Sequence, residues 1–247
     1  MPSRREKSDL SDMASPESGS AVQPLRPGAN PSPPQVLVDL TSELRWFFDG
    51  RPSEEVLSWF THGGATGLTE DRCDAYRLDG QVDIGVKRRF RTVLELKLRL
   101  GPPELFFIGR DVDGWLETWQ RWSPADGRIY LPENTTWVDV DKTIIKRRFS
   151  SDGRELPLSE ETRAMTGQGC DAEIATVSVQ GRTGWTFAFA AFGPAESHRS
   201  SLELAWDALV SDRPCPRRLR LRCTDSCGYP EWIAKADSGD AVRPRSS

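Results

Sequence analysis

The segment TVLELKLRL, residues 92 to 100, alternates apolar and charged residues without interruption. Successive side chains of a β-strand point to opposite faces of its sheet, so this period of two predicts a strand with one apolar and one charged face. The apolar face carries Leu94, Leu96, Leu98 and Leu100. The charged face carries Glu95, Lys97 and Arg99.

Similar alternation continues on both sides of this segment. It is found in VLVDLTSELRWFF (36–48), DRCDAYRL (71–78), QVDIGVKRRF (81–90), WLETWQRW (115–122), TWVDVDKTIIKRRF (136–149), GCDAEIATVSVQ (169–180) and TGWTFAFAAFG (183–193). Residues 79 and 80, Asp-Gly, are a hairpin signal between two of these strands. Helical spacing is convincing only after Ser53 and in SSLELAWDALV, residues 200–210. With so little helix between strands, the pattern predicts a mainly β (α+β) domain, a closed or nearly closed antiparallel barrel with a few flanking helices.

The rest of the composition sets the boundaries of this domain. Residues 1–35 are rich in Ser, Pro and charge, as are residues 236–247, and such segments bury too little apolar surface to offset the entropy of ordering. We therefore expect a disordered tail at each end and one barrel domain over residues 36–235. Nine Trp and ten Phe supply large apolar groups for its core.

Net charge and cysteine content restrict the possible partners. A net charge of −4 makes the chain a poor general match for nucleic acid or an anionic membrane, so an anion site would be local. No apolar stretch has the length of a membrane helix, and the N-terminus lacks the apolar core of a secretory signal. Five irregularly spaced cysteines argue against a disulfide framework. We expect a cytoplasmic protein without a nucleic-acid or membrane partner.

Basic residues recur at alternating strand positions. They are Arg45, Lys87, Arg89, Lys97, Arg99, Arg121 and the run Lys146-Arg147-Arg148. They lie either on a solvated exterior around an apolar core or on a charged interior, and a charged interior requires water, anions or metal ions because unpaired buried charges are costly. In the second case Arg and Lys would bind phosphate oxygens, and Glu43, Glu95 and Glu173 would hold a divalent cation.

The order of these segments resembles the CYTH, or triphosphate tunnel metalloenzyme, superfamily. The resemblance spans most of residues 36–233 and rests on TSELR (41–45) followed by a helix, GVKRR, LELKLR, TIIKRRF, CDAEIATV and WTFAFAAFG. It implies an eight-stranded antiparallel tunnel that binds a triphosphate or polyphosphate and, in many members, hydrolyses or cyclises it with Mg²⁺ or Mn²⁺. The resemblance assigns phosphate binding to Arg45, Lys87, Arg89, Lys97, Arg99, Arg121 and Arg147. It assigns metal binding to Glu43 and Glu173.

The sequence departs from the family pattern at carboxylates. The opening motif of the family is E-x-E-x-K, but Thr41 replaces the first Glu and Arg45 replaces the Lys. Ala190 stands where a metal-binding Glu is common. Because a two-metal mechanism needs several carboxylates, three functions stay open. They are a metal-dependent triphosphate phosphohydrolase, a non-catalytic module that binds polyphosphate, a nucleotide or a phosphorylated partner, and a protein-interaction barrel with its charges outside.

Other catalytic or metal sites have weaker signals. His62 and His198 are the only histidines, so few bases are available for a nucleophilic triad. The late cysteines, Cys215, Cys223 and Cys227, lack the paired spacing of a zinc site and are better explained as incidental thiols. The tryptophans Trp115, Trp119 and Trp122 are better explained by sheet packing than by stacking on a base.

Overall fold

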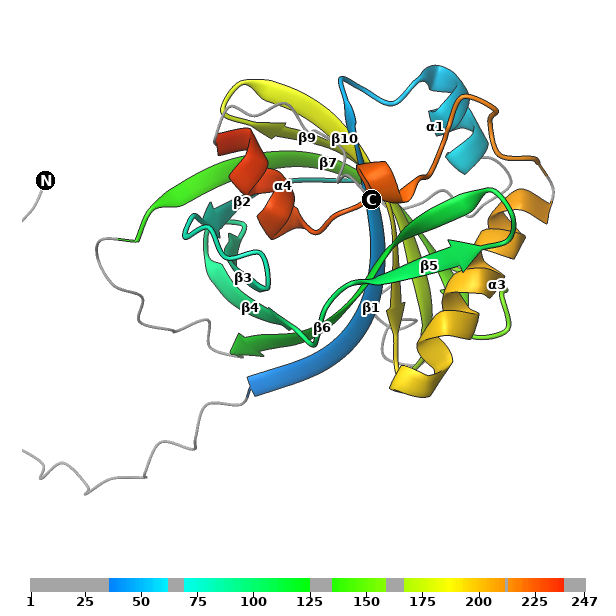
Figure 1. The fold of residues 1–247 in the computed structure, drawn as a ribbon, viewed down its shortest axis with the longest axis horizontal. Helices are drawn as coiled ribbons and strands as arrows, with labels where there is room; N and C mark the ends of the chain where they lie inside the picture. Colours follow the sequence, from blue (N-terminus) through cyan, green and yellow to red (C-terminus); the bar gives the residue numbers. More distant parts are fainter. Residues whose placement is uncertain (1–35, 62–68, 125–134, 159–166, 212, 238–247) are drawn as a thin grey trace, which may run out of the picture. The chain divides into compact units, whose positions relative to one another are not determined.

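The computed structural model describes residues 36–61, 69–124, 135–158, 167–211 and 213–237. Within these residues, eight antiparallel strands form a closed barrel, and β6 pairs back to β1 (Figure 1). In order around the barrel they are β1 (Val36–Asp49), β10 (Arg182–Phe192), β9 (Gly169–Val179), β7 (Trp137–Ser150), β2 (Thr69–Arg77), β3 (Ile84–Arg89), β4 (Val93–Arg99) and β6 (Val112–Pro124). The short strands β5 (Glu104–Ile108) and β8 (Glu155–Leu156) pair with β6 and β7. The predicted mainly β, eight-stranded barrel is confirmed.

Local sequence explains how neighbouring strands connect. Val179 of β9 pairs with Arg182 of β10, so only Gln180 and Gly181 form the turn. Both have positive φ, 48° and 79°. This is the conformation of a two-residue hairpin turn whose twist matches that of the flanking strands.

Three α-helices of the described residues accompany the barrel. Helix α1 (Glu54–Thr61) begins after Ser53, whose Oγ accepts a hydrogen bond of 3.3 Å from the backbone N–H of Val56. Helix α3 (His198–Ser211) includes the second predicted helical segment. Helix α4 (Tyr229–Asp237) was not predicted, because a nine-residue segment is too short to be helical without tertiary packing. No helix in the described residues is long and apolar enough to cross a membrane.

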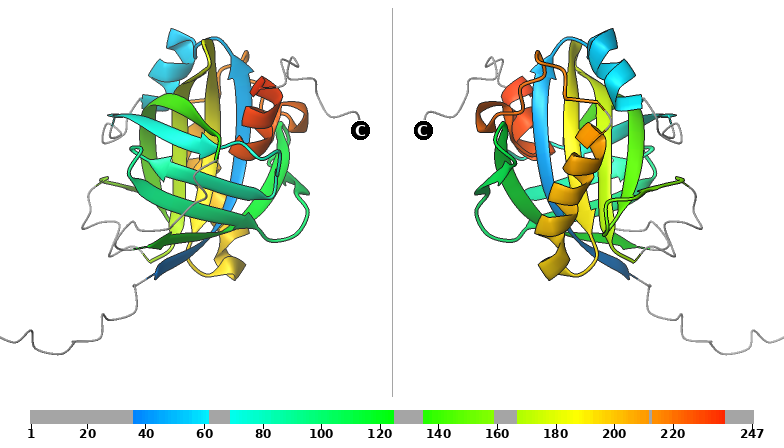
Figure 2. Two further views of the ribbon diagram at one scale, coloured as in Figure 1. Left: turned by 90° about the vertical axis from the view of Figure 1, so that its left-hand side faces the viewer. Right: turned by 90° about the vertical axis from the view of Figure 1, so that its right-hand side faces the viewer.

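The largest apolar cluster lies on the outer face of the barrel wall. Trp46 of β1 and Phe187 and Phe189 of β10 pack there against Phe60 of α1 and Trp206 of α3. Figure 2 shows α3 lying along the strands on this side. This face is therefore a two-layer core of helix on sheet.

A second apolar cluster includes α4 and closes one end of the barrel. Phe47 of β1 stacks on Trp232 of α4, with 4.8 Å between ring centroids, and Val140, Val177 and Ile233 belong to the same cluster. Figure 1 shows α4 at this end. Gly228 stands immediately before α4. A Cβ atom at this position would lie only 2.6 Å from Oε2 of Glu117, so the absence of a side chain permits this close approach.

Candidate functional site

The position of Tyr229 identifies the inner face of the wall. Its ring centroid lies 5.3 Å from that of Phe47 on β1 and 5.6 Å from that of Tyr76 on β2. Three strands separate β1 from β2 in either direction around the barrel, so these two strands are opposite walls. A ring that contacts both of them lies inside. Side chains that share a strand face with Phe47 or Tyr76 therefore point inward.

The inner face of the described residues is dominated by charge. Its basic residues are Arg45, Arg72, Lys87, Arg89, Lys97, Arg99, Arg121, Lys142, Lys146 and Arg148. Its acidic residues are Asp39, Glu43, Glu70, Asp74, Glu95, Glu117, Asp171 and Glu173. The basic groups outnumber the acidic ones, although the chain as a whole has a net charge of −4.

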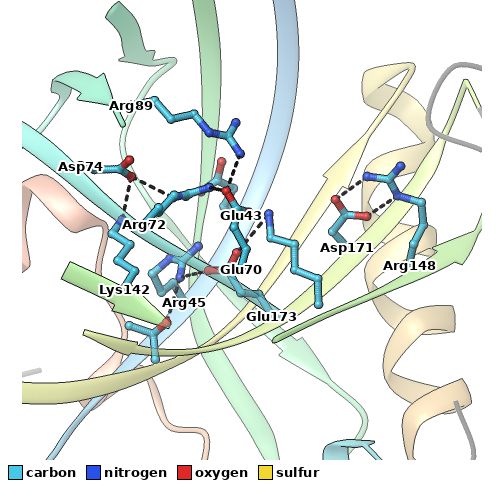
Figure 3. Close-up of polar contacts among 12 residues, drawn as sticks. Glu43, Arg45, Glu70, Arg72, Asp74, Arg89, Lys142, Arg148, Asp171 and Glu173 are labelled. Atoms are coloured by element: carbon cyan, nitrogen blue, oxygen red, sulfur yellow. Dashed lines mark hydrogen bonds and ion pairs between the residues drawn. The ribbon is translucent and has the colours of Figure 1, made fainter. Parts of the chain in front are cut away.

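Glu173 and Glu43 connect strands that are not neighbours. Oε1 of Glu173 accepts a 3.0 Å hydrogen bond from Arg45, and its Oε2 lies 3.3 Å from Nζ of Lys146. Oε1 of Glu43 lies 2.5 Å from Nζ of Lys97. Burial alone would raise the pKa of each carboxyl, but the cations overcome it, so the pKa of Glu43 falls to about 2 and that of Glu173 falls well below its usual value. Figure 3 shows Glu43, Arg45 and Glu173 among other charged side chains of the barrel.

Asp74 is the centre of a deeper cluster. Its buried Oδ2 lies 3.2 Å from Nε of Arg72, 3.4 Å from Nζ of Lys142 and 3.7 Å from Nζ of Lys87. Lys142 also donates a 2.6 Å hydrogen bond to Tyr76 and lies 3.8 Å from the Tyr229 ring centroid. Burial and the charge of Lys87 lower the pKa of Lys142 well below its usual value. Three basic side chains thus share one carboxylate beside the closed end.

Several inner side chains that lie farther from α4 are more exposed than those next to it. On β7 the Lys142 side chain is 2% exposed and that of Lys146 is 26% exposed. On β2 the Asp74 side chain is fully buried and that of Glu70 is 22% exposed. The interior is therefore closed at the α4 end and reaches solvent at the other.

Six of the seven predicted phosphate-binding residues lie on this inner face: Arg45, Lys87, Arg89, Lys97, Arg99 and Arg121. Arg147 does not, and grouping it with them was wrong. It bonds to Glu155 of β8 and to the carbonyl oxygen of Phe60 in α1, on the outer side. Its neighbours Lys146 and Arg148 occupy the other face of β7, since side chains alternate. Arg148 forms two hydrogen bonds with Asp171, a pair that Figure 3 shows apart from the Glu173 group.

The predicted metal ligands do not form a metal centre in the described residues. Glu43 and Glu173 are each bonded to basic side chains, as described above. No group of three or more His, Cys, Asp or Glu side chains suited to a metal ion occurs in the described part of the chain. The residues present therefore do not fit a two-metal site, and Mg²⁺ or Mn²⁺ stays a prediction.

Several inner residues were missed from the sequence. Glu70, Arg72 and Asp74 stand at every second position of β2, a charged alternation like that of residues 92–100, so a signal was present. Lys142 follows the same rule on β7. Tyr229 carried no such signal, because its role depends on contacts with strands far away in the sequence.

The other sequence candidates have structural roles or lie outside the site. Nδ1 of His198 is 2.8 Å from Oγ of Ser42, and its Nε2 is 3.0 Å from the carbonyl oxygen of Gly193, so this buried ring is held on both sides. His62 lies outside the described residues. Trp119 is buried below Arg99, whose guanidinium carbon is 5.7 Å from its ring centroid.

Comparison with known proteins adds no identity to this geometry. No family model, no curated protein and no solved structure matches the chain.

Proposed function

We propose that the interior of the barrel binds a linear oligophosphate, such as a triphosphate compound, by its terminal phosphates and without a required metal ion. The observation that carries this proposal is the excess of basic over acidic groups on the inner face, where several basic side chains share one carboxylate. Unpaired buried charge is costly, so a surplus of cations favours a bound anion.

The open end offers the donors that a phosphate chain requires. The side chains of Lys97, Arg89 and Lys146 are 28%, 27% and 26% exposed, and they come from three different strands. Phosphate oxygens accept several charge-assisted hydrogen bonds at once, so donors that converge from separate strands suit an oligophosphate better than a single carboxylate. The α4 end is closed by aromatic packing, which favours entry of the ligand by one end.

The acidic residues act as counter-ions in this proposal. Glu43, with its pKa held at about 2, stays ionised at neutral pH and pairs with Lys97 in the free protein. A phosphate group would compete with Glu43 for Lys97. Glu43 would then remain beside Arg45, and the charge of Arg45 also lowers the pKa of Glu43. Such exchange makes binding sensitive to salt and independent of a chelator.

Calorimetric titration of the full chain with tripolyphosphate in EDTA tests the proposal. We expect binding, and we expect the double change Lys97→Met and Lys146→Met to weaken it at least tenfold, since each charge-assisted hydrogen bond contributes about 1.5–3 kcal/mol. Arg199→Gln is the control, because Arg199 is 55% exposed on α3 and pairs with Glu104 outside the barrel.

Two other results would change the conclusion. If tripolyphosphate bound only with Mg²⁺ or Mn²⁺ and phosphate were released, the function would be metal-dependent hydrolysis and not metal-free binding. Absence of binding under both conditions would leave a protein-interaction barrel whose inner ion pairs are structural.

A further inference from the structure

A groove with a volume of about 550 Å³ lies outside the barrel. The turn between β5 and β6 lines it on one side, the C-terminal half of α3 on another, and the segment after α3 on a third. Its volume falls within the roughly 300–1,000 Å³ range of small-molecule sites. The oligophosphate proposal uses no residue of this groove.

Apolar side chains form the floor of the groove. They are Ile108, Val112, Trp206, Val210 and Leu219. Four of them belong to the outer core, and Val210 packs against that core while remaining partly exposed. The floor is thus a continuation of the main core that reaches solvent.

Arginines form the rim. They are Arg110, Arg217, Arg220 and Arg222. Asp111 is the acidic residue among the described lining residues, and Arg222 also pairs with Asp113 at 2.8 Å. Arg110, Arg217 and Arg220 are exposed, and no ion pair is found for them among the described residues. The rim therefore has an excess of positive charge next to apolar surface.

The wall that carries these arginines is anchored. The carbonyl oxygen of Arg213 accepts a 3.1 Å hydrogen bond from the Trp59 indole, and that of Leu221 accepts a 3.0 Å bond from the backbone N–H of Asp113. Pro214 and Pro216 restrict the backbone between these anchors. A groove held in this way needs little ordering before it binds a ligand.

We propose that this groove binds an amphipathic organic anion, with its apolar body on the floor and its carboxylate, sulfonate or phosphate group on the arginine rim. Apolar burial supplies the contact area, and the guanidinium groups supply planar donors that match the oxygens of such a head group. The complementary charge selects an anion over a neutral apolar molecule.

Fluorescence titration of the full chain with 1-anilinonaphthalene-8-sulfonate tests this proposal, and N-phenyl-1-naphthylamine serves as the matched neutral probe. We expect saturable binding of the sulfonate at one site and at least tenfold weaker binding of the neutral probe. Changing both Arg217→Gln and Arg220→Gln should weaken sulfonate binding at least tenfold and leave the neutral probe unaffected. Val210→Glu should weaken both probes, since it places a carboxylate on the partly exposed floor.

Two controls locate the binding. Lys97→Met with Lys146→Met should leave sulfonate binding unchanged, because those residues face the barrel interior. Arg217→Gln with Arg220→Gln should leave tripolyphosphate binding unchanged. Each of the two proposals can therefore be disproved without affecting the other. Equal affinity for the two probes, or sulfonate binding that survives the arginine changes in a protein of normal melting temperature, would overturn the groove proposal.

Discussion

The two faces of the barrel wall differ in chemical character, since the outer face is apolar and the inner face is charged. On the outer face, Trp46, Phe187 and Phe189 pack with helices into a dry core. On the inner face of the wall, Arg45 of β1 and Glu173 of β9 bond to each other across β10. Adjacent residues of one strand, Arg45 and Trp46, thus belong to a charged network and to the main core. The apolar core stabilises the barrel from outside, and its interior is left for polar chemistry.

Phe187→Ala is the strongest way to disturb the outer face. The Phe187 side chain is fully buried, and its ring packs against those of Trp46, Trp59, Phe60 and Phe189. We expect a loss of about 3–5 kcal/mol in the free energy of unfolding, because the change removes a large apolar group and leaves a cavity. Urea unfolding measures this loss.

Phe107→Ala is the matched control, since Phe107 of β5 is 59% exposed. It should change the free energy of unfolding by less than about 0.5 kcal/mol. Equal losses for the two variants would mean that the outer cluster is not the main core.

The positions of the eight barrel strands were predictable, but which face of each strand points into the barrel was not. A period of two places Lys97 and Leu98 on opposite sides of β4 whichever side is inside. The choice depends on what covers each face, and the covering residues, such as Trp206 of α3 and Trp232 of α4, are distant in sequence. Arg147 shows the same limit of prediction from sequence. The sequence places three basic residues in a row on β7 but does not tell which of them point inward.

Glu173→Gln tests the inner face with little change in shape. It leaves Arg45 and Lys146 facing a neutral amide, so we expect a loss of roughly 3 kcal/mol in the free energy of unfolding, the lower end for a broken buried ion pair. Tripolyphosphate should bind this variant more tightly than the parent, because the interior becomes more positive. Thermal unfolding with and without tripolyphosphate measures both effects.

A matched change at an exposed pair separates local from general effects. Glu104→Gln removes the partner of Arg199 on the surface, where both side chains are more than half exposed. It should alter neither stability nor tripolyphosphate binding. If Glu104→Gln and Glu173→Gln changed stability and tripolyphosphate binding to the same extent, the inner face would have no special role.

The acid sensitivity of the protein should come from the inner carboxylates. Burial would raise the pKa of Glu95, but Lys87 and Lys97 lower it to about 2. A carboxyl whose pKa is depressed by folding stabilises the protein above its unfolded pKa of about 4.5, and this contribution is lost as the pH falls toward the folded pKa. Between pH 5 and pH 3 we expect Glu95 to account for roughly 2 kcal/mol of lost stability.

The measurement is urea unfolding of the parent and of Glu95→Gln at pH 7, 5 and 3. The variant should be less stable at pH 7, and the difference between the two proteins should shrink as the pH falls. A constant difference across this range would show that Glu95 is not ionised through its inner contacts.

The smallest expected effects come from two arginines that are close in sequence. Arg89 ends β3 on the inner face, where it lies 3.6 Å from Glu70 and 3.8 Å from Glu95, and its side chain is 27% exposed. Arg91 lies in the following turn with its side chain 61% exposed, and it bonds to Asp139 at 2.6 Å. Arg89→Gln should weaken tripolyphosphate binding several-fold, because it removes one charge-assisted donor at the open end. Arg91→Gln should leave the affinity within a factor of two at physiological salt, since exposed charges are screened over about 8 Å. Arg89→Gln should change the free energy of unfolding by no more than about 1 kcal/mol. If calorimetry gave the two variants the same loss of affinity, the anion would be responding to net charge rather than to donors on the inner face, and the distinction between the two faces would not extend to binding.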